Sequence, residues 1–165
     1  MEKTTKKSEI KRYWHLIDAK DKILGRLATG VIPLLIGKNK PYFVHNLDCG
    51  DHVVIINSKY VKFTGKKLEQ KQYDSYSGYP AGRRIRTLSE LMEKTPEKVI
   101  LSAVSGMLPD NKLKRLWLGK LYIFPQSEHQ FEKKFIKNEN LTKESEKKAS
   151  VKKLSTKHSK MEENK

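Results

Sequence analysis

Apolar residues fall into short segments whose spacing alternates between that of a strand and that of a helix. Tyr13–Asp18 is rich in residues that favour strands, and Val53–Asn57 begins with a continuous apolar run, typical of a strand covered on both faces. Between them, apolar residues recur at helical spacing and predict a helix over 24–35: Leu24, Leu27, Ala28, Val31, Leu34 and Leu35. We expect Gly37 to cap this helix, and Pro33 to kink it or end its regular part early.

The second half of the chain contains signals for three further helices. Thr87 and Glu90 form a capping box that starts a short helix ending at about residue 94. Pro96 is suited to the first position of a second helix. The predicted buried stripe of that helix consists of Val99, Ile100, Ala103, Val104, Met107 and Leu108. A basic helix is expected over 111–118.

Two more short segments favour strands. These are Tyr60–Phe63, which precedes Gly65, and Leu121–Phe124, which Pro125 closes. Strands that alternate with helices are typical of an α/β fold with a largely parallel sheet, and this is the fold class that the pattern predicts.

Charge is distributed unevenly along the chain. The 165 residues include 35 Lys and Arg against 19 Asp and Glu, which gives a formal net charge of +16. Residues 38–86 carry ten basic and four acidic side chains, and 112–120 carry four basic and no acidic ones, whereas 87–111 carry two basic and four acidic ones. We therefore expect a cationic face that binds a polyanion, since each neutralised phosphate releases condensed counterions.

Composition also predicts the organisation of the chain. We expect a basic N-terminal arm over 1–12, a single domain over 13–135 and a Lys-rich, disordered C-terminal extension over 136–165, because the two ends contain few apolar residues. The single cysteine, Cys49, excludes an internal disulfide. There is no apolar run of about 18 residues and no secretory signal, so we expect a cytoplasmic protein without a membrane partner.

Two groups of residues could suggest an enzyme. Gly25 and Gly30 have the spacing of a phosphate-binding loop, but Val31 follows where that loop needs lysine, so helix packing is favoured. A second group contains metal-ligand and nucleophile residue types: His45, Asp48, Cys49, Asp51 and His52. Its spacing matches no standard zinc site, and a polar loop before the strand at 53 is favoured. We expect no catalytic residue, metal, cofactor or small-molecule substrate.

Basic and aromatic residues are interleaved in two stretches, Lys38–Phe43 and 73–86. Tyrosine rings can stack on unpaired bases, and arginine binds phosphate with two parallel hydrogen bonds. A solvated surface loop is the alternative, but the mixture of Tyr, Gly and Arg favours RNA. The candidate RNA-binding residues fall in the segment after the first helix, in loops at 59–71 and 76–86, and in the helix at 112–120. They are Lys38, Lys40, Lys59, Lys62, Lys66, Lys67, Lys71, Tyr76, Tyr79, Arg83, Arg84, Arg86, Lys112, Lys114, Arg115 and Lys120.

Several motifs in order resemble the bacterial form of the large-subunit ribosomal protein thirteen family. They are Trp14–Ala28, Gly50–Asn57, Thr64–Lys67, Ser77–Pro80 and Gly106–Asn111. The likeness runs from about residue 13 to 129. It departs from the family at Cys49, where threonine is common, at Leu113-Lys114-Arg115, which replaces Leu-Gly-Arg, and at His129-Gln130-Phe131, which replaces His-Pro-His.

The resemblance implies a three-layer α/β/α domain around a small parallel sheet. It also implies a structural constituent of the large ribosomal subunit that binds 23S-type ribosomal RNA early in assembly, beside neighbouring large-subunit proteins. A free RNA-binding regulatory protein that uses the same basic face is the alternative. A nucleotide-dependent enzyme is disfavoured, because an α/β fold does not by itself supply a site.

Overall fold

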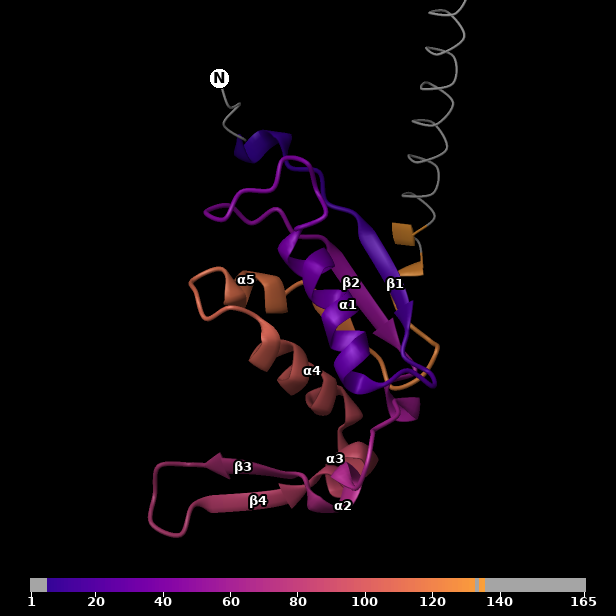
Figure 1. The fold of residues 1–165 in the computed structure, drawn as a ribbon, viewed down its shortest axis with the longest axis vertical. Helices are drawn as coiled ribbons and strands as arrows, with labels where there is room; N and C mark the ends of the chain where they lie inside the picture. Colours follow the sequence, from indigo (N-terminus) through magenta and orange to yellow (C-terminus); the bar gives the residue numbers. More distant parts are fainter. Residues whose placement is uncertain (1–5, 133, 136–165) are drawn as a thin grey trace, which may run out of the picture. The chain divides into compact units, whose positions relative to one another are not determined.

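A computed structural model describes residues 6–132 and 134–135. The chain divides into two compact units, Met1–His129 and Gln130–Lys165, and the extension predicted over 136–165 lies outside the described residues. In the second unit, Lys134 Nζ lies 5.0 Å from the ring centre of Phe131. The elements of the first unit are η1 (Lys7–Glu9), β1 (Trp14–Asp18), α1 (Leu24–Ile36), β2 (His52–Ile56), η2 (Ser58–Tyr60), α2 (Lys67–Gln70), β3 (Gln72–Tyr76), β4 (Arg83–Thr87), α3 (Leu88–Lys94), α4 (Pro96–Met107), α5 (Lys114–Leu118) and β5 (Leu121–Ile123) (Figure 1).

The main sheet has three strands in the order β1-β2-β5, and both pairings are parallel. Trp14 lies opposite His52, and Val53 lies opposite Leu121. The central strand β2 is fully buried at 53–55, as expected for a parallel strand covered on both faces. The predicted α/β fold with a small parallel sheet is confirmed.

The strand predicted at Tyr60–Phe63 is wrong. Asn57 adopts a left-handed conformation with φ 60°, and η2 follows it, so the chain turns away from the sheet. Only an isolated parallel bridge between Ile23 and Lys62 remains. Val61 and Phe63, two positions apart, both pack in the main apolar cluster. The segment therefore has the spacing of a strand although it does not pair as one.

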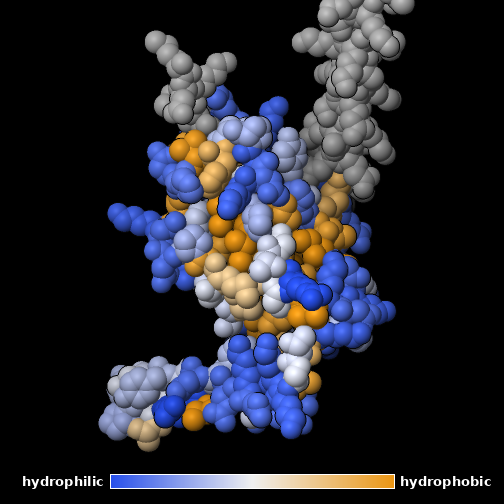
Figure 2. Space-filling view, viewed as in Figure 1, coloured by the Kyte–Doolittle hydropathy of each residue, from blue (hydrophilic) through white to orange (hydrophobic). Residues whose placement is uncertain are grey.

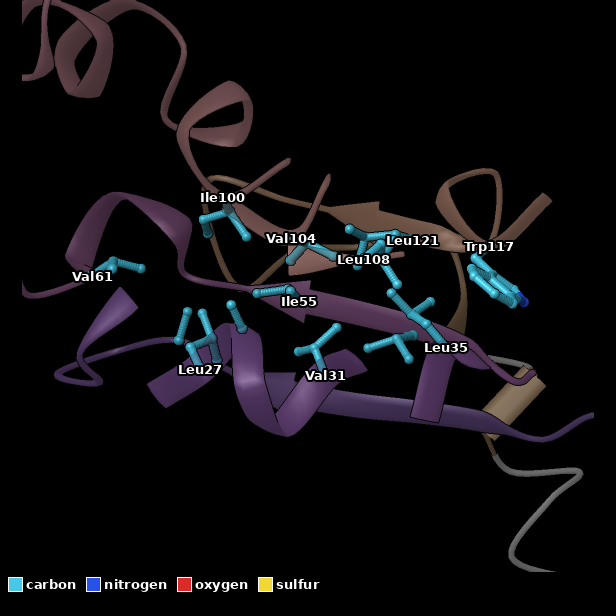
Figure 3. Packing of buried hydrophobic residues seen from close by; sticks show 13 residues of the cluster. Leu27, Val31, Leu35, Ile55, Val61, Ile100, Val104, Leu108, Trp117 and Leu121 are labelled. Carbon is cyan, nitrogen blue, oxygen red and sulfur yellow. The ribbon is translucent and has the colours of Figure 1, made fainter. Parts of the chain in front are cut away.

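The main core joins one face of the sheet to the helices. Leu27 and Val31 of α1 lie on one side of Ile55, Val104 of α4 lies on the other, and Leu35 lies near Leu121 and Trp117 (Figure 3). The predicted stripe of α1 is confirmed. In α4 the predicted stripe is too wide, because Met107 is 46% exposed and Ala103 only partly buried.

The ends of the helices follow from local chemistry. Gly37 caps α1 with φ 83°, and a Cβ there would lie 2.5 Å from the carbonyl oxygen of Cys49, so glycine is required. Pro33 does not end α1 early, because Thr29, whose carbonyl loses its helical donor, is exposed to water.

The other predicted helix starts are confirmed at α3 and α4 and shifted at α5. The hydroxyl of Thr87 accepts a hydrogen bond from the N–H of Glu90 at 3.4 Å, and Pro96 opens α4. The basic helix begins at Lys114 rather than at 111. The side chain of Asn111 accepts hydrogen bonds from the N–H groups of Leu113 and Lys114, which makes Asn111 a turn residue before the helix.

Parallel pairing brings the residues that precede the strands together at one edge of the sheet. Tyr13, Asp51 and Lys120 each stand immediately before a strand. Around them lies a group of charged side chains that we call the amino-edge cluster: Arg12, His15, Lys40, Asp48, Asp51 and Lys120.

Two buried ion pairs form the centre of the amino-edge cluster. Lys40 Nζ donates to Asp51 Oδ1 at 2.5 Å, and Lys120 Nζ donates to Asp48 Oδ1. Burial of Asp51 favours its neutral form, but hydrogen bonds from His15, from Lys40 and from the N–H of Tyr13 outweigh that effect and hold its pKa below the ordinary value. Burial is the main cause that lowers the pKa of Lys120, and Asp48 opposes it.

We predict that Asp51 makes the free energy of unfolding depend on pH. Because the pKa of Asp51 is lower in the folded chain than in the unfolded chain, its stabilising effect is present above about pH 4 and is lost as pH falls through the folded pKa. At pH 7, Asp51→Asn leaves the buried Lys40 without its carboxylate and should cost about 3 kcal/mol of unfolding free energy.

The difference in unfolding free energy between the wild type and Asp51→Asn should narrow as pH falls from 7 to 3, since the wild-type carboxyl becomes neutral as well. Urea unfolding across that range measures it. Asp110→Asn is the control, because that carboxylate is 93% exposed and its pair with Lys114 is screened by solvent. A constant difference between Asp51→Asn and the wild type at all pH values would contradict the prediction.

Candidate nucleic-acid interface

The stretch 73–86, of which 76–86 was predicted as a loop, forms most of an antiparallel hairpin. In β3 and β4, Tyr76 pairs with Arg83, Ser75 with Arg84, and Tyr73 with Arg86. The hairpin extends beyond α2 and α3 (Figure 1). Nearly all of its strand residues are exposed, so the sequence lacks the alternation of apolar and polar positions that identifies a half-buried strand.

The turn of the hairpin explains the small residues at its tip. Gly78 has φ 88° and Ala81 has φ 60°, conformations that favour glycine and small turn residues. The N–H of Gly82 donates to the carbonyl of Tyr79 at 2.9 Å. The tip therefore holds the ring of Tyr79, which is 75% exposed, outward.

The two faces of the hairpin differ in charge. Side chains alternate along a strand, so the pairing places Arg84 and Arg86 on the same face as Tyr73. Within the described residues neither of these arginines pairs with a carboxylate. On the opposite face, Arg83 Nε donates to Asp74 Oδ2 at 2.7 Å, so the carboxylate compensates the positive charge of Arg83 in this exposed pair.

Apolar contacts at the base of the hairpin connect it to α3. Tyr73 packs against the small cluster of Leu88, Leu91 and Val99, and burial raises the pKa of its hydroxyl. Lys71 Nζ lies 5.2 Å from the centre of the Tyr73 ring, within the range of a cation–π contact. The surface over the hairpin and the neighbouring helices is mostly hydrophilic (Figure 2).

The remaining candidate lysines lie in two places. Lys59, Lys66, Lys67 and Lys71 are exposed around η2 and α2, whereas Lys62 makes an exposed ion pair with Asp21 at 2.8 Å. Near α5, Lys112 and Arg115 are exposed, and Lys114 pairs with Asp110 at 2.8 Å.

Lys40 and Lys120 occupy positions that differ from the sequence interpretation. Their side chains are only 10% and 9% exposed, and both ammonium groups are directed to carboxylates and carbonyl oxygens of the amino-edge cluster. These contacts argue against direct RNA contact by the two lysines. Lys38, two residues before Lys40, is exposed.

Sequence interpretation also missed a basic groove beside α1. The groove, of about 500 Å³, is lined by Ile17, Asp21, Lys22, Ile23, Arg26, Leu27 and Gly30. Lys22 and Arg26 stand there among apolar residues of the helix pattern, and charge density along the sequence gave no signal for them. Gly25 and Gly30 lie inside α1 rather than in a phosphate-binding loop, but a Cβ at either position would meet nothing within 4 Å, so close packing does not require glycine there.

Cys49 lies between α1 and β2, in the polar loop that the sequence favoured. It is fully buried, with Sγ 4.0 Å from the carbonyl oxygen of Tyr42. Over 6–132 and 134–135, no group of three or more His, Cys, Asp or Glu side chains is placed to hold a metal ion. The helices of the same residues include none long and apolar enough to cross a membrane.

Comparison with known proteins gives a consistent result. Residues 12–130 match the family model described as ribosomal protein L13. A protein of Helicobacter hepaticus named large ribosomal subunit protein uL13 is 52% identical over 127 residues, which are 77% of this chain and 89% of that protein. Proteins of the same name from Helicobacter pylori and Helicobacter acinonychis are each 49% identical over 129 residues, 78% of this chain and 92% of theirs. The chain therefore belongs to the ribosomal protein L13 family.

Proposed function

We propose that this chain is a structural protein of the large ribosomal subunit, in the cytoplasm, that binds 23S-type ribosomal RNA and supports early assembly of the subunit beside neighbouring proteins. The names of its relatives place those proteins in the large subunit. The observation that carries the RNA-binding part is the hairpin face with Arg84 and Arg86, two cations without a carboxylate partner among the described residues.

The hairpin offers two kinds of contact to RNA. Arg84 and Arg86 are two positions apart on one strand, so their side chains leave the same face about 7 Å apart and can bind different phosphates. The rings of Tyr76 and Tyr79, 67% and 75% exposed, can stack on unpaired bases. Exposed lysines around α2 and α5 would add phosphate contacts without selecting a sequence.

A free RNA-binding regulator would use the same chemistry, so affinity alone does not distinguish the two functions. Sedimentation with large ribosomal subunits distinguishes them. A structural constituent should co-sediment with large subunits after a wash in moderate salt and should be present at about one copy per subunit. Recovery only at the top of the gradient, as free protein, would contradict the proposal.

We predict that Arg84→Gln together with Arg86→Gln removes about two phosphate contacts. The slope of log affinity against log salt for a 23S-type RNA transcript should become shallower by about 1.5 to 2. Arg83→Gln should change the slope less, because Asp74 already neutralises Arg83.

Lys94→Gln with Lys98→Gln is the matched control for this prediction. It removes the same charge from exposed positions in α3 and α4, within the acidic part of the chain. An equal change of slope in the control would show that net charge alone governs binding, and the assignment to the hairpin would be wrong.

We predict a different effect for the tyrosines. Tyr76→Leu with Tyr79→Leu should weaken RNA binding by about 1 to 3 kcal/mol for each base that stacks, while the salt slope stays unchanged because no charge is lost. Titration of labelled RNA at three salt concentrations measures both quantities. A change of slope without loss of affinity at high salt would contradict a stacking role.

A further inference from the structure

We infer that the amino edge of the sheet is a second RNA-contact surface, in which Lys11, Arg12 and Lys38 bind backbone phosphates and Asp48 and Asp51 hold them in position. This inference rests on the proposed function. It proposes a second site in addition to the hairpin. It also reverses the role that the sequence analysis gave to Lys40 and Lys120, which become internal counter-ions.

The topology explains why a second surface exists. The arm before β1, the segment between α1 and β2, and the turn before β5 all meet at the edge where the parallel strands begin. The hairpin follows η2 and α2, which come after the end of β2, and it forms a separate sheet. Basic segments therefore come both before the strands of the main sheet and after β2.

The arm is fixed to the domain through its main chain. Lys40 Nζ donates to the carbonyl of Lys11 at 2.6 Å, and the hydroxyl of Tyr42 donates to the same carbonyl at 3.2 Å. The N–H of Tyr13 donates to Asp51 Oδ1 at 2.9 Å, and the carbonyl of Tyr13 accepts from the N–H of His52 at 2.9 Å. These bonds hold the exposed side chains of Lys11 and Arg12 at a fixed place beside the segment that begins with Lys38.

The charges of this edge do not cancel. Asp51 is matched by Lys40, and Asp48 by Lys120. Arg12 Nη2 lies 3.4 Å from Asp48 Oδ2, so Arg12 shares a carboxylate that already has a buried partner, and its side chain is 45% exposed. Lys11 and Lys38 are exposed and make no ion pair within the described residues. His15 lies at the cluster beside Asp51, and Glu9 is the exposed acid of the arm.

An anionic ligand is therefore attracted to Arg12, Lys11 and Lys38, and the backbone of RNA supplies phosphates in series. The two aspartates have the same sign of charge as the ligand, and simple electrostatics would make them unfavourable. Their contribution is geometric, because the arm is held by Asp51 directly and by Asp48 through Arg12. Asp48 and Asp51 are positioning residues.

The first test removes the exposed cations. Lys11→Gln with Arg12→Gln should make the salt slope for a 23S-type RNA transcript shallower by about 1 to 2 and should weaken binding at least about tenfold at 0.1 M salt. Lys94→Gln with Lys98→Gln, with an equal loss of charge, should leave the slope unchanged. An unchanged slope in the Lys11 and Arg12 variant, or an equal change in the control, would overturn the inference.

The second test asks whether Asp48→Asn strengthens or weakens RNA binding. Asp48→Asn increases the net positive charge by one, so a purely electrostatic surface would bind RNA more tightly, whereas a positioned surface should bind about five- to tenfold more weakly. Asp48→Asn with Lys120→Met removes the buried lysine that the first change leaves without its carboxylate. Unfolding stability should recover in the double variant, but RNA affinity should stay low, since Arg12 still lacks Asp48.

Recovery of both quantities would reduce Asp48 to a stability role and overturn the positioning role. Tighter binding by Asp48→Asn would do the same. If Asp48→Asn does not fold, the Lys11 and Arg12 variant decides alone, because it changes only exposed side chains. The Arg84 and Arg86 variant separates the two levels of proposal. A shallower salt slope for that variant, with an unchanged slope for the Lys11 and Arg12 variant, rejects this inference only. An unchanged slope for both variants rejects the assignment of phosphate contacts to the hairpin as well.

Discussion

The parallel pairing of β1, β2 and β5 is the constraint on which the core and the amino-edge cluster depend, whereas β3 and β4 form a separate antiparallel sheet. The parallel pairing places Tyr13, Asp51 and Lys120 at one edge, although they are separated by up to 107 positions in the sequence. Register matters as much as direction. A shift of β1 by one residue against β2 would turn Ile17 out of the core and separate the N–H of Tyr13 from Asp51. The two faces of β1 oppose this shift, because Leu16 is 48% exposed while Ile17 packs against the core, and a slip by one residue would exchange them.

A chain with a net charge of +16 must still hold its own parts together, and it does so with some of its cations. Lys40 and Lys120 are buried with carboxylates, where each ammonium also reaches main-chain carbonyl oxygens. Such pairs stabilise little relative to an apolar core, because desolvation opposes the Coulomb attraction, but they fix one arrangement of the segments they join. Lysine in this chain therefore serves two purposes, and exposure separates them: buried ammonium groups orient the backbone, and exposed ones are available to phosphate.

The parts of the fold that bury apolar area were predictable. The stripe of α1 and the run of β2 follow from periods that burial imposes, and Thr87 and Pro96 mark helix starts by local hydrogen bonding and fixed φ. The hairpin was not, since its strands bury almost nothing and its pairing depends on the turn at 77–82. The site was only partly predictable. Charge density along the chain pointed to Arg84 and Arg86, but it treated Lys40 like Lys38, because the partner of Lys40 lies 11 residues away in a carboxylate that folding brings to it.

In the ribonucleoprotein role that we propose, this chain contributes through where it places its contacts. Here one short sheet separates two kinds of contact. At the hairpin, Tyr76 lies on the face opposite Arg84 and Arg86, and Tyr79 lies in the turn, so base stacking and phosphate binding would use different parts of one hairpin. At the amino edge, the polar contacts are cationic and fixed through the main chain. Under the two proposals, stacking would constrain the position of an RNA segment at the hairpin, whereas charge and the fixed arm would constrain one at the amino edge. The amino-edge cluster lies where the three strands begin, and the hairpin follows β2 through η2 and α2. The proposed contacts would therefore be made at separate places on one folded unit, and selectivity for a folded RNA would come from that geometry rather than from base-specific hydrogen bonds.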